Sequence, residues 1–338
     1  MILVTGGTGH LGNVLVRKLI NLGEKVVVVT HPSDNCISLE DINVEIKKID
    51  VRDYKNLEKI AKNSDIIFHL AAIISILPWK KKLIEEVNVE GVKNIINISQ
   101  KYNKRLIYVS SVHAFSEPQI GSTIDENTPI NPKLTSGIYG KSKAKAALEI
   151  LNASKAGLNV STICPTGIIG PFDFKPSEMG KFFLSYLKNK IKIIIEGEFD
   201  FVDVRDVADI LIKALDKGKK GEFYIISNKS IKISELIGLL DLITGKKTNL
   251  KIIDNNTALF VSFFNLIGSL LTGKIPLFTP YSIHTLSRKY KFSHLKAKNE
   301  LDYKPRNFES TLFDTLQWFK EYFVYKHFPK KLLINWFF

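Results

Sequence analysis

Cysteine is scarce in this 338-residue sequence, which contains only Cys36 and Cys164. Two cysteines so far apart provide neither a disulfide framework nor the closely spaced ligands of a structural zinc site. No basic segment followed by an apolar run comes before the first predicted strand, so no secretory signal is expected. These absences predict a reducing, cytoplasmic setting and no bound metal.

Acidic residues are outnumbered, with 34 Asp and Glu against 48 Lys and Arg, and the formal net charge is +14. This charge admits an anionic cofactor, a nucleic acid or an anionic lipid as partner. The lysines are dispersed rather than interleaved with aromatic residues, and no nucleic-acid-binding motif is present. We therefore expect a solvated basic surface and no nucleic-acid partner.

The first twelve residues combine a short apolar strand with a glycine-rich turn and then a helical pattern of leucines. Gly6, Gly9 and Gly12 follow the strand at intervals of three. Strand, glycine turn and helix in this order are typical of the first βαβ unit of a dinucleotide-binding fold, where backbone amides at the helix N-terminus meet the pyrophosphate. The residues expected to contact the cofactor here are Gly6, Gly9, His10, Leu11 and Gly12.

The end of the second predicted strand, residues 25–30, bears on the choice between NAD and NADP. An acid at this place commonly bonds the ribose hydroxyls of NAD, whereas an Arg suits the 2′-phosphate of NADP. The sequence has His31, Pro32 and Ser33 there, and neither an acid nor an Arg. Both cofactors stay open, but the missing carboxylate and a phosphate contact from His31 and Ser33 favour NADP slightly.

Further apolar runs predict the other strands of a parallel sheet, at residues 44–49, 65–69, 105–110 and 159–164. A helix is predicted over 80–100. We therefore predict an α/β protein, with a Rossmann-type doubly wound parallel sheet and a smaller, mostly helical C-terminal substrate domain. The expected division is 1–165 for the nucleotide-binding domain and 166–338 for the substrate domain, with segments at about 200–228 returning to the first.

Tyr139 and Lys143 lie one helical turn apart, which places both side chains on one face of a predicted helix. A free phenol has a pKa near ~10, too high for a proton carrier at neutral pH, and a neighbouring ammonium group lowers it. The Tyr-x-x-x-Lys pattern alone is common on solvated helix faces. Its place after five strands and a glycine turn favours a catalytic pair, with Ser111 at a strand's carboxyl end as the second contact to a substrate oxygen.

At this point the sequence resembles the extended short-chain dehydrogenase/reductase family, the NAD-dependent epimerase/dehydratase group. The resemblance rests on residues 5–12, 50–53, 68–72, 109–111, Asn88, Tyr139 and Lys143. It implies that Tyr139 is the general acid/base, that Lys143 holds the nicotinamide ribose and tunes Tyr139, and that Ser111 orients the substrate oxygen. The other cofactor contacts that it implies are His31, Asp50, Val51, Leu70, Ala71, Ala72, Asn88, Pro165, Thr166 and Gly167.

Two further stretches are similar to one subgroup, the dihydroflavonol reductases, 3β-hydroxysteroid dehydrogenases and their bacterial relatives. They are residues 201–208, where an Arg begins a helix, and residues 296–306. Nucleotide-sugar epimerases often have an Arg before the Pro at position 165 and an Asn two residues after it. This sequence has Cys164 and Gly167 there, which weakens the nucleotide-sugar interpretation.

Residues 258–271 are apolar nearly all round but too short for the roughly 20 residues that cross a bilayer. We expect them to form either a buried helix over the substrate pocket or a helix that lies in a membrane interface. Residues 330–338, in which lysines come before apolar residues, also have the pattern of an interfacial segment. A weak membrane-surface contact through these two segments, and a homodimer, are further expectations.

The sequence thus predicts an NAD(P)-dependent oxidoreductase acting on a secondary alcohol or ketone of a fairly apolar, small-molecule ring substrate. The alternative is a nucleotide-sugar epimerase or dehydratase that uses the same three residues with tightly held cofactor. A non-catalytic, cofactor-sensing module is a third hypothesis, and the intact Tyr139, Lys143 and Ser111 argue against it.

Overall fold

A computed structural model describes the chain except for residues 76, 255–256, 258–289 and 326–338. The segments 258–271 and 330–338, for which the sequence predicts a membrane-surface contact, lie outside the described residues. No helix within the described ranges is both long and apolar enough to cross a membrane.

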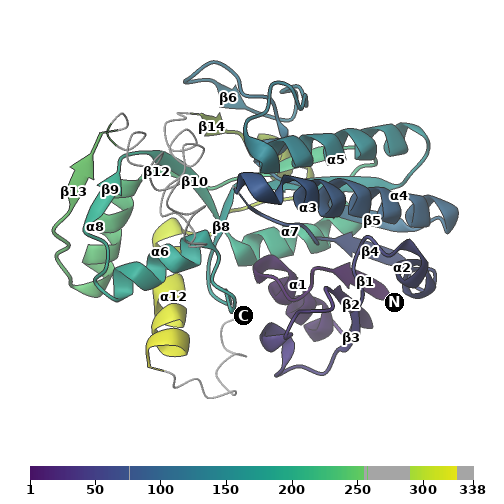
Figure 1. Cartoon of the computed structure of the whole chain (residues 1–338), viewed down its shortest axis with the longest axis horizontal. Coiled ribbons are helices and arrows are strands. Elements are labelled where there is room, and N and C mark those ends of the chain that lie inside the picture. The colour runs from purple at the N-terminus through teal and green to yellow at the C-terminus, as the bar shows by residue number, and fades with distance from the viewer. Residues whose placement is uncertain (76, 255–256, 258–289, 326–338) are drawn as a thin grey trace.

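A parallel, seven-stranded sheet forms the larger part of the molecule (Figure 1). Its order is β11-β7-β5-β4-β1-β2-β3, so the chain reverses its direction of travel across the sheet between β1 and β4. The strands are β1 (Ile2–Thr5), β2 (Val26–Thr30), β3 (Glu45–Lys48), β4 (Ile66–His69), β5 (Arg105–Val109), β7 (Val160–Pro165) and β11 (Phe223–Ile226). This arrangement confirms the predicted Rossmann-type fold, in which ligands bind at the carboxyl edge where the order reverses.

Helices cover both faces of this sheet, and alternate residues of each strand supply the two cores. Ile2 and Val4 pack on the side of α1 (His10–Asn21) and α7 (Val204–Asp216). Leu3 packs on the opposite side. The helices there are α2 (Tyr54–Ala61), α4 (Gly91–Lys101) and α5 (Gly137–Lys155). Because both faces are buried, central strands such as β1 and β2 are continuous apolar runs without polar alternation, whereas the edge strand β3 is partly exposed.

The helix predicted over 80–100 is interrupted in the structure. It consists of α3 (Lys81–Glu85), a π-helical turn η3 (Glu86–Glu90) and α4, and a short 3₁₀ turn, η2 (Pro78–Lys80), comes before it. The π turn contains Asn88, which is buried. Single π turns within helices are often found at functional sites, and Asn88 is one of the predicted site residues.

The second part of the molecule lies beyond β7 and mixes helices with small sheets. Its sheets are β8 (Gly167–Ile169) with β10 (Glu198–Asp203) and β12 (Lys229–Lys232), and β9 (Ile193–Ile195) with β13 (Lys251–Ile253). Its helices are α6 (Glu178–Leu187), α8 (Ile233–Thr244), α11 (Leu295–Glu300) and α12 (Phe308–Phe319), which the π turn η5 (Lys320–Val324) continues. A third small sheet joins β6 (Thr123–Ile124) to β14 (Lys291–Phe292), and 3₁₀ turns occur at η1 (Ile37–Leu39) and η4 (Val112–Ala114).

Buried polar contacts join this part to the larger sheet. Asp203 caps the N-terminus of α7 and pairs with Arg205 at 2.6 Å, and it also accepts a hydrogen bond from Thr311 of α12. Burial would raise the pKa of Asp203, but the contacts with Arg205 lower it overall. Asp203 is therefore an ionised, fully engaged structural residue. Its motif at 201–208 joins the two parts of the fold.

Candidate active site

The glycine turn between β1 and α1 leaves open space at one position only. A Cβ at Gly6, whose φ is 72°, would lie 2.8 Å from the Ala71 nitrogen, and one at Gly12 would overlap the Gly6 carbonyl oxygen. Gly9 has an ordinary extended backbone, with φ −75° and ψ 175°, and a Cβ there would meet only the Gly6 oxygen, at 3.4 Å. Protein packing therefore requires Gly6 and Gly12, whereas Gly9 keeps space free at the N-terminus of α1, as a bound pyrophosphate needs.

The start of α1 is tied to the loop after β8. The Asn13 amide donates to the carbonyl oxygens of Gly9, His10 and Phe172. The His10 ring lies 2.9 Å from the Pro171 oxygen, while Leu11 is buried in the core. Sequence reasoning missed Asn13, although a polar residue one turn into an otherwise apolar helix face is a usable signal.

The ends of β2 and β3 carry paired charges. The His31 side chain is 58% exposed, with Nδ1 2.7 Å from Ser33 Oγ and Nε2 3.5 Å from the Asp50 carboxylate. Asp34, which sequence reasoning missed, accepts from Thr8 of the glycine turn at 3.0 Å and pairs with Lys175 at 2.6 Å. Burial would raise the pKa of Asp34, but Lys175 and two further donors lower it overall.

Asp50 and Val51 join the end of β3 to α4. Asp50 forms an ion pair with Arg52 at 2.7 Å, and this contact lowers the pKa of Asp50. Val51 is buried, and its carbonyl oxygen accepts from Asn94 of α4. The Val51 side chain packs where a Cβ at Gly91 would stand. These contacts hold the loop after β3 against α4.

The loop after β4 is held from two sides. The Leu70 amide donates to the Thr5 carbonyl oxygen, and Ala71 and Ala72 follow it beside the glycine turn. Asn88 accepts from the Ile73 amide and donates to the Ile73 oxygen and to Ser142 of α5. The Asn88 amide group is thus engaged by the protein itself, and we infer that it positions this loop.

Ser111, Tyr139 and Lys143 come together at the carboxyl end of β5. Ser111 follows β5 and begins η4, where its Oγ accepts from the His113 amide at 3.3 Å. The first turn of α5, which carries Tyr139, packs on η4, and the Tyr139 and His113 rings lie 6.1 Å apart. The Lys143 Nζ donates to the Val109 oxygen at 3.0 Å. A serine hydroxyl that accepts one bond still has its own proton to donate to a substrate oxygen.

The Lys143 ammonium group is buried and has no carboxylate partner among the described residues. It lies 5.2 Å from the centre of the Tyr108 ring, a cation–π contact. Burial lowers the pKa of Lys143 to about 8. Lys143 is therefore mostly charged at neutral pH, and it supplies positive charge one helical turn from Tyr139.

His69 and Tyr108 lie close to Lys143. The sequence does not predict a role at the site for either residue. The two rings stack at 5.9 Å, and His69 Nδ1 is 2.7 Å from Thr5 Oγ1. Burial, with Lys143 nearby, lowers the pKa of His69 to about 3, so the ring is neutral. A neutral imidazole adds no charge that would compete with Lys143 near the phenol.

Pro165, Thr166 and Gly167 form the crossing from the large sheet to the small one. Pro165 ends β7 and pairs with Ile226, and the Thr166 amide donates to the Ile226 oxygen. Gly167 begins β8, where a Cβ would lie 3.0 Å from the Asp200 oxygen and from the Phe201 ring. A side chain at position 167 would thus be in tight contact with both groups.

The fold and this constellation define a nicotinamide-dependent enzyme of the short-chain dehydrogenase/reductase type. The sequence profile of the NAD dependent epimerase/dehydratase family matches residues 2–227, and the chain belongs to that family. The family resemblance that the sequence indicates is thereby confirmed, and so is the prediction that the chain is an enzyme.

Individual relatives are similar over nearly the whole chain. "Sterol demethylase protein B" of Methylococcus capsulatus is 27% identical, over 94% of this chain and 98% of the relative. "3beta-hydroxysteroid-dehydrogenase/decarboxylase isoform 1" of Arabidopsis thaliana is 29% identical, over 89% of this chain and 75% of the relative. The crystal structure of gox2253 is 28% identical with a TM-score of 0.83, and covers 96% of this chain and 98% of that one.

Gly9→Val should abolish dinucleotide binding while the protein stays folded, because the new side chain meets solvent space and not protein. Gly12→Ala is the matched control, since its methyl group meets the Gly6 carbonyl and should lower the melting temperature. Calorimetric titration with NADPH and NADH, together with thermal unfolding, tests both. Unchanged affinity of Gly9→Val for both cofactors would disprove this use of the turn.

Lys143→Met should weaken cofactor binding yet stabilise the cofactor-free protein, by roughly 1–3 kcal/mol at pH 7, because a buried ammonium group is costly. The folded pKa of about 8 lies below the ordinary 10.5, so this cost is complete below pH 8 and disappears as the pH rises to 10.5. Denaturant unfolding of both proteins across this range measures the difference. Lys141→Met, at an exposed position of the same helix, should change stability little, and equal behaviour of the two variants would contradict the burial argument.

Proposed function

We propose that this chain is an NAD(P)-dependent oxidoreductase that interconverts a secondary alcohol and a ketone on a fairly apolar ring substrate. The observation that carries the proposal is the grouping of Ser111, Tyr139 and Lys143 at the carboxyl end of β5, close to the open turn at Gly9. The printed names of the relatives from Methylococcus capsulatus and Arabidopsis thaliana refer to sterols and hydroxysteroids. These names support a fused, apolar ring system as the substrate class.

The nicotinamide cofactor, when bound, supplies or accepts the hydride, and the chain's own groups handle the oxygen and the proton. The Ser111 hydroxyl donates to the substrate oxygen. Tyr139 passes its phenolic proton to that oxygen in reduction and takes it back in oxidation. The positive charge of Lys143 favours the phenolate form of Tyr139.

A nucleotide-sugar epimerase or dehydratase is the alternative, and the crossing after β7 argues against it. Cys164 is fully buried, and Gly167 has no side chain and is closely packed against Asp200 and Phe201. Two places from which a nucleotide-sugar enzyme often binds its substrate thus present no polar group here. The deciding experiment is to screen hydroxysteroids, other cyclic ketones and nucleotide sugars for net NAD(P)H production or consumption, because an epimerase returns its cofactor unchanged.

Tyr139→Phe keeps the ring and removes the proton carrier. Cofactor binding should persist, and turnover of the substrate found in that screen should fall by about 10²- to 10⁴-fold. Tyr102→Phe, on α4, is the matched control and should retain activity. Near-normal turnover of Tyr139→Phe would leave His113 as the next candidate for the proton carrier. Asp203 is not a candidate, because it already binds Arg205 and Thr311.

We also propose that NADPH is preferred to NADH. The two carboxylates near the end of β2, Asp34 and Asp50, are each already paired with a cation, Lys175 and Arg52 respectively. The exposed His31 ring and Ser33 are then the groups that meet the substituent on the adenine ribose. A phosphate fits this pair of hydrogen-bonding side chains better than bare hydroxyls do.

His31→Asp should therefore weaken NADPH binding and leave NADH binding equal or tighter, because a new carboxylate repels the 2′-phosphate and accepts from ribose hydroxyls. Fluorescence titration of the wild type and the variant with both reduced cofactors measures the ratio of dissociation constants. Tighter binding of NADH by the wild type would refute the proposed preference and leave the assignment of Tyr139 untouched.

The cellular setting we propose is the cytoplasm. Cys36 and Cys164 are both free thiols, and a buried thiol such as Cys164 persists most easily in a reducing compartment.

A further inference from the structure

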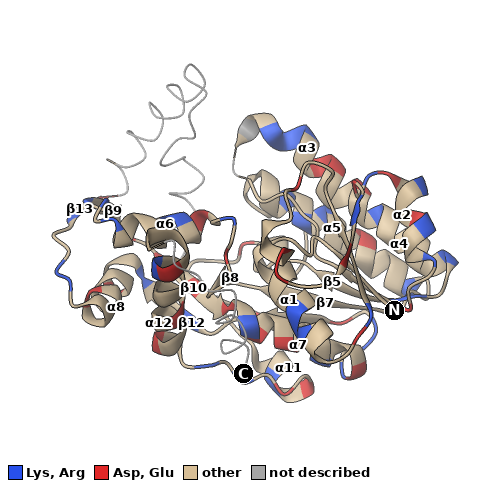
Figure 2. Cartoon of the chain, turned by 90° about the horizontal axis from the view of Figure 1, so that it is seen from below, with Lys and Arg blue, Asp and Glu red and all other residues tan. Residues whose placement is uncertain are grey.

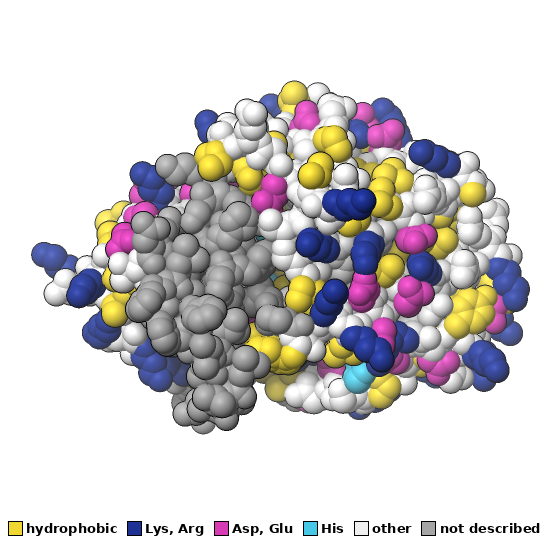
Figure 3. Space-filling model, turned by 45° about the horizontal axis from the view of Figure 1, so that its top comes forward, with side chains coloured by type: hydrophobic (Ala, Val, Ile, Leu, Met, Phe, Trp, Pro, Cys, Tyr) yellow, Lys and Arg dark blue, Asp and Glu magenta, His cyan; other side chains and the backbone are white. Residues whose placement is uncertain are grey.

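The outer end of the second part of the molecule carries a lysine-rich patch, which Glu196, Asp241 and Asp254 border. Residues 188–195 and 245–253, which include β9 and β13, contain no Asp or Glu. The exposed side chains, which we name the β9–β13 patch, are Lys188, Lys190, Lys192, Lys247, Lys251, Ile193 and Ile252. Figure 3 shows Lys and Arg side chains gathered at the left end of the molecule, the end that β9 and β13 occupy in Figure 1.

The charges of the exposed lysines are not neutralised by ion pairs among the described residues. Lys246 turns back to the carbonyl oxygen of Leu187 and to Asn189. None of the five exposed lysines of the patch forms an ion pair with a described residue. Ile193 and Ile252 are 50% and 54% exposed, so apolar side chains stand among the free cations.

A second surface of the same character begins at the loop after β4. Ile74, Trp79 and Leu83 are 75%, 49% and 39% exposed, and Lys80, Lys81 and Lys82 lie between the last two. We name these residues the α3 patch. Lysines in the first turn of a helix are unfavourable for its dipole, so local helix stability does not explain them.

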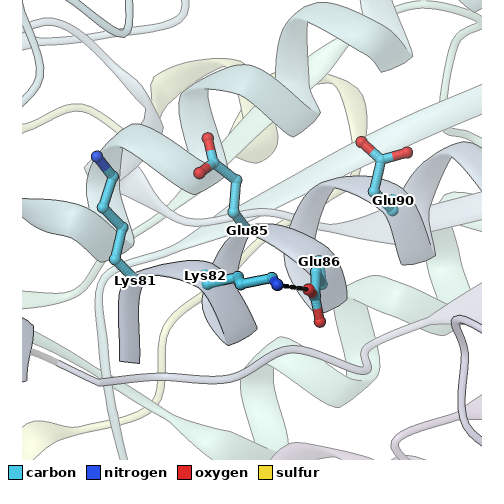
Figure 4. A pocket seen from close by; sticks show the side chains of 5 residues that line it. All are labelled: Lys81, Lys82, Glu85, Glu86 and Glu90. Atoms are coloured by element: carbon cyan, nitrogen blue, oxygen red, sulfur yellow. Dashed lines mark ion pairs between the residues drawn. The ribbon is translucent and has the colours of Figure 1, made fainter. Parts of the chain in front are cut away.

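The glutamates further along this helix neutralise the α3 patch only in part. Glu85 pairs with Lys145, and Glu86 pairs with Arg52 at 2.8 Å. Lys82, whose side chain is 92% exposed, forms a long ion pair with Glu86, at 4.0 Å (Figure 4). The shallow hollow of about 380 Å³ in Figure 4 is lined by Lys81, Lys82, Glu85, Glu86 and Glu90, and charges of both signs meet there.

The elements that carry the two patches lie toward one side of the molecule. In Figure 2, α3 and the strands β9 and β13 lie in the upper half, whereas α7 and α11 lie in the lower half. The α3 patch follows closely on Leu70 to Ala72 at the carboxyl edge of the large sheet.

We propose that these two patches dock the protein on the surface of a lipid bilayer that contains anionic phospholipids. Each lysine near such a surface contributes roughly 1 kcal/mol of attraction. Trp79 and the exposed isoleucines are suited to the headgroup boundary, where apolar and amphipathic side chains insert. This inference goes beyond the proposed function and requires neither cofactor nor substrate.

The composition of the two patches favours a lipid bilayer over a nucleic acid as the partner. Neither patch contains an Arg, and Trp79 is their only aromatic residue, whereas nucleic-acid surfaces rely on Arg and on repeated aromatic stacking. Lysines also protect exposed sheet edges from pairing with other chains. Protection of an edge needs charge of either sign, but attraction to anionic lipid needs positive charge, so charge reversal distinguishes the two roles.

The test is sedimentation of the full chain with vesicles of phosphatidylcholine alone and of phosphatidylcholine with phosphatidylglycerol. We expect binding to the anionic vesicles only, and weaker binding as salt is raised. The triple variant Lys190→Glu, Lys192→Glu, Lys251→Glu should lower partitioning by at least about 100-fold. The matched control reverses three exposed lysines near α11, Lys220, Lys298 and Lys304, and should bind more than ten times as well as the patch variant.

Trp79 provides a second readout in a Trp336→Phe background, because Trp318 is fully buried and Trp336 is the third tryptophan of the chain. In that background the emission should shift to shorter wavelength on anionic vesicles, and most of this shift should be absent when Trp79→Phe is added. Equal loss in the patch and control triple variants would show that net charge alone drives binding and would overturn the proposal. So would equal binding to neutral vesicles, or no binding to either kind.

Discussion

The close approach of β1, the glycine turn and the loop after β4 is the constraint on which the site depends. Gly6 turns the chain under Ala71, and Gly12 lets α1 begin directly against the Gly6 carbonyl. Side chains at these two positions would push α1 away from the sheet and from β4. Gly6 and Gly12 let α1 and the strands approach closely, and the space at Gly9 lies between these two close contacts. The dinucleotide groove is thus a consequence of backbone packing, and the charged residues around it adjust what it accepts.

The sequence predicted six of the seven strands of the large sheet, all but β11, because most of these strands are buried on both faces. Every residue of β2 is buried, and such apolar runs leave a signal that does not depend on loops. The carboxyl ends of these strands then led to the prediction of Ser111 as a site residue, and helical spacing led to the prediction of Tyr139 and Lys143. Contacts between loops could not be predicted in this way. Asp34 meets Lys175 only because the loop after β8 returns to the glycine turn, and no periodic pattern describes that path.

The π turn at Asn88 illustrates the same limit within a helix. An apolar pattern over 80–100 predicts one continuous helix, and the extra residue in a π turn leaves that pattern almost unchanged. What distinguishes the turn is its partners, since the buried Asn88 amide bridges Ile73 and Ser142. Tertiary hydrogen bonds compensate for the poorer backbone geometry of the turn. The irregular turn thereby holds the loop after β4 against the helix that carries Tyr139 and Lys143.

Charge is distributed unevenly around the site, and this distribution bears on the chemistry. Ion pairs cluster at the ends of β2 and β3, where Lys175 and Arg52 each hold a carboxylate. At the end of β5, Lys143 is a buried cation with no carboxylate partner among the described residues. A carboxylate there would stabilise Lys143 but would cancel its field at the phenol. The unpaired ammonium group costs folding free energy and leaves a full charge to act on Tyr139. Cys164 and Gly167 themselves carry no charge, as suits residues beside an apolar ring.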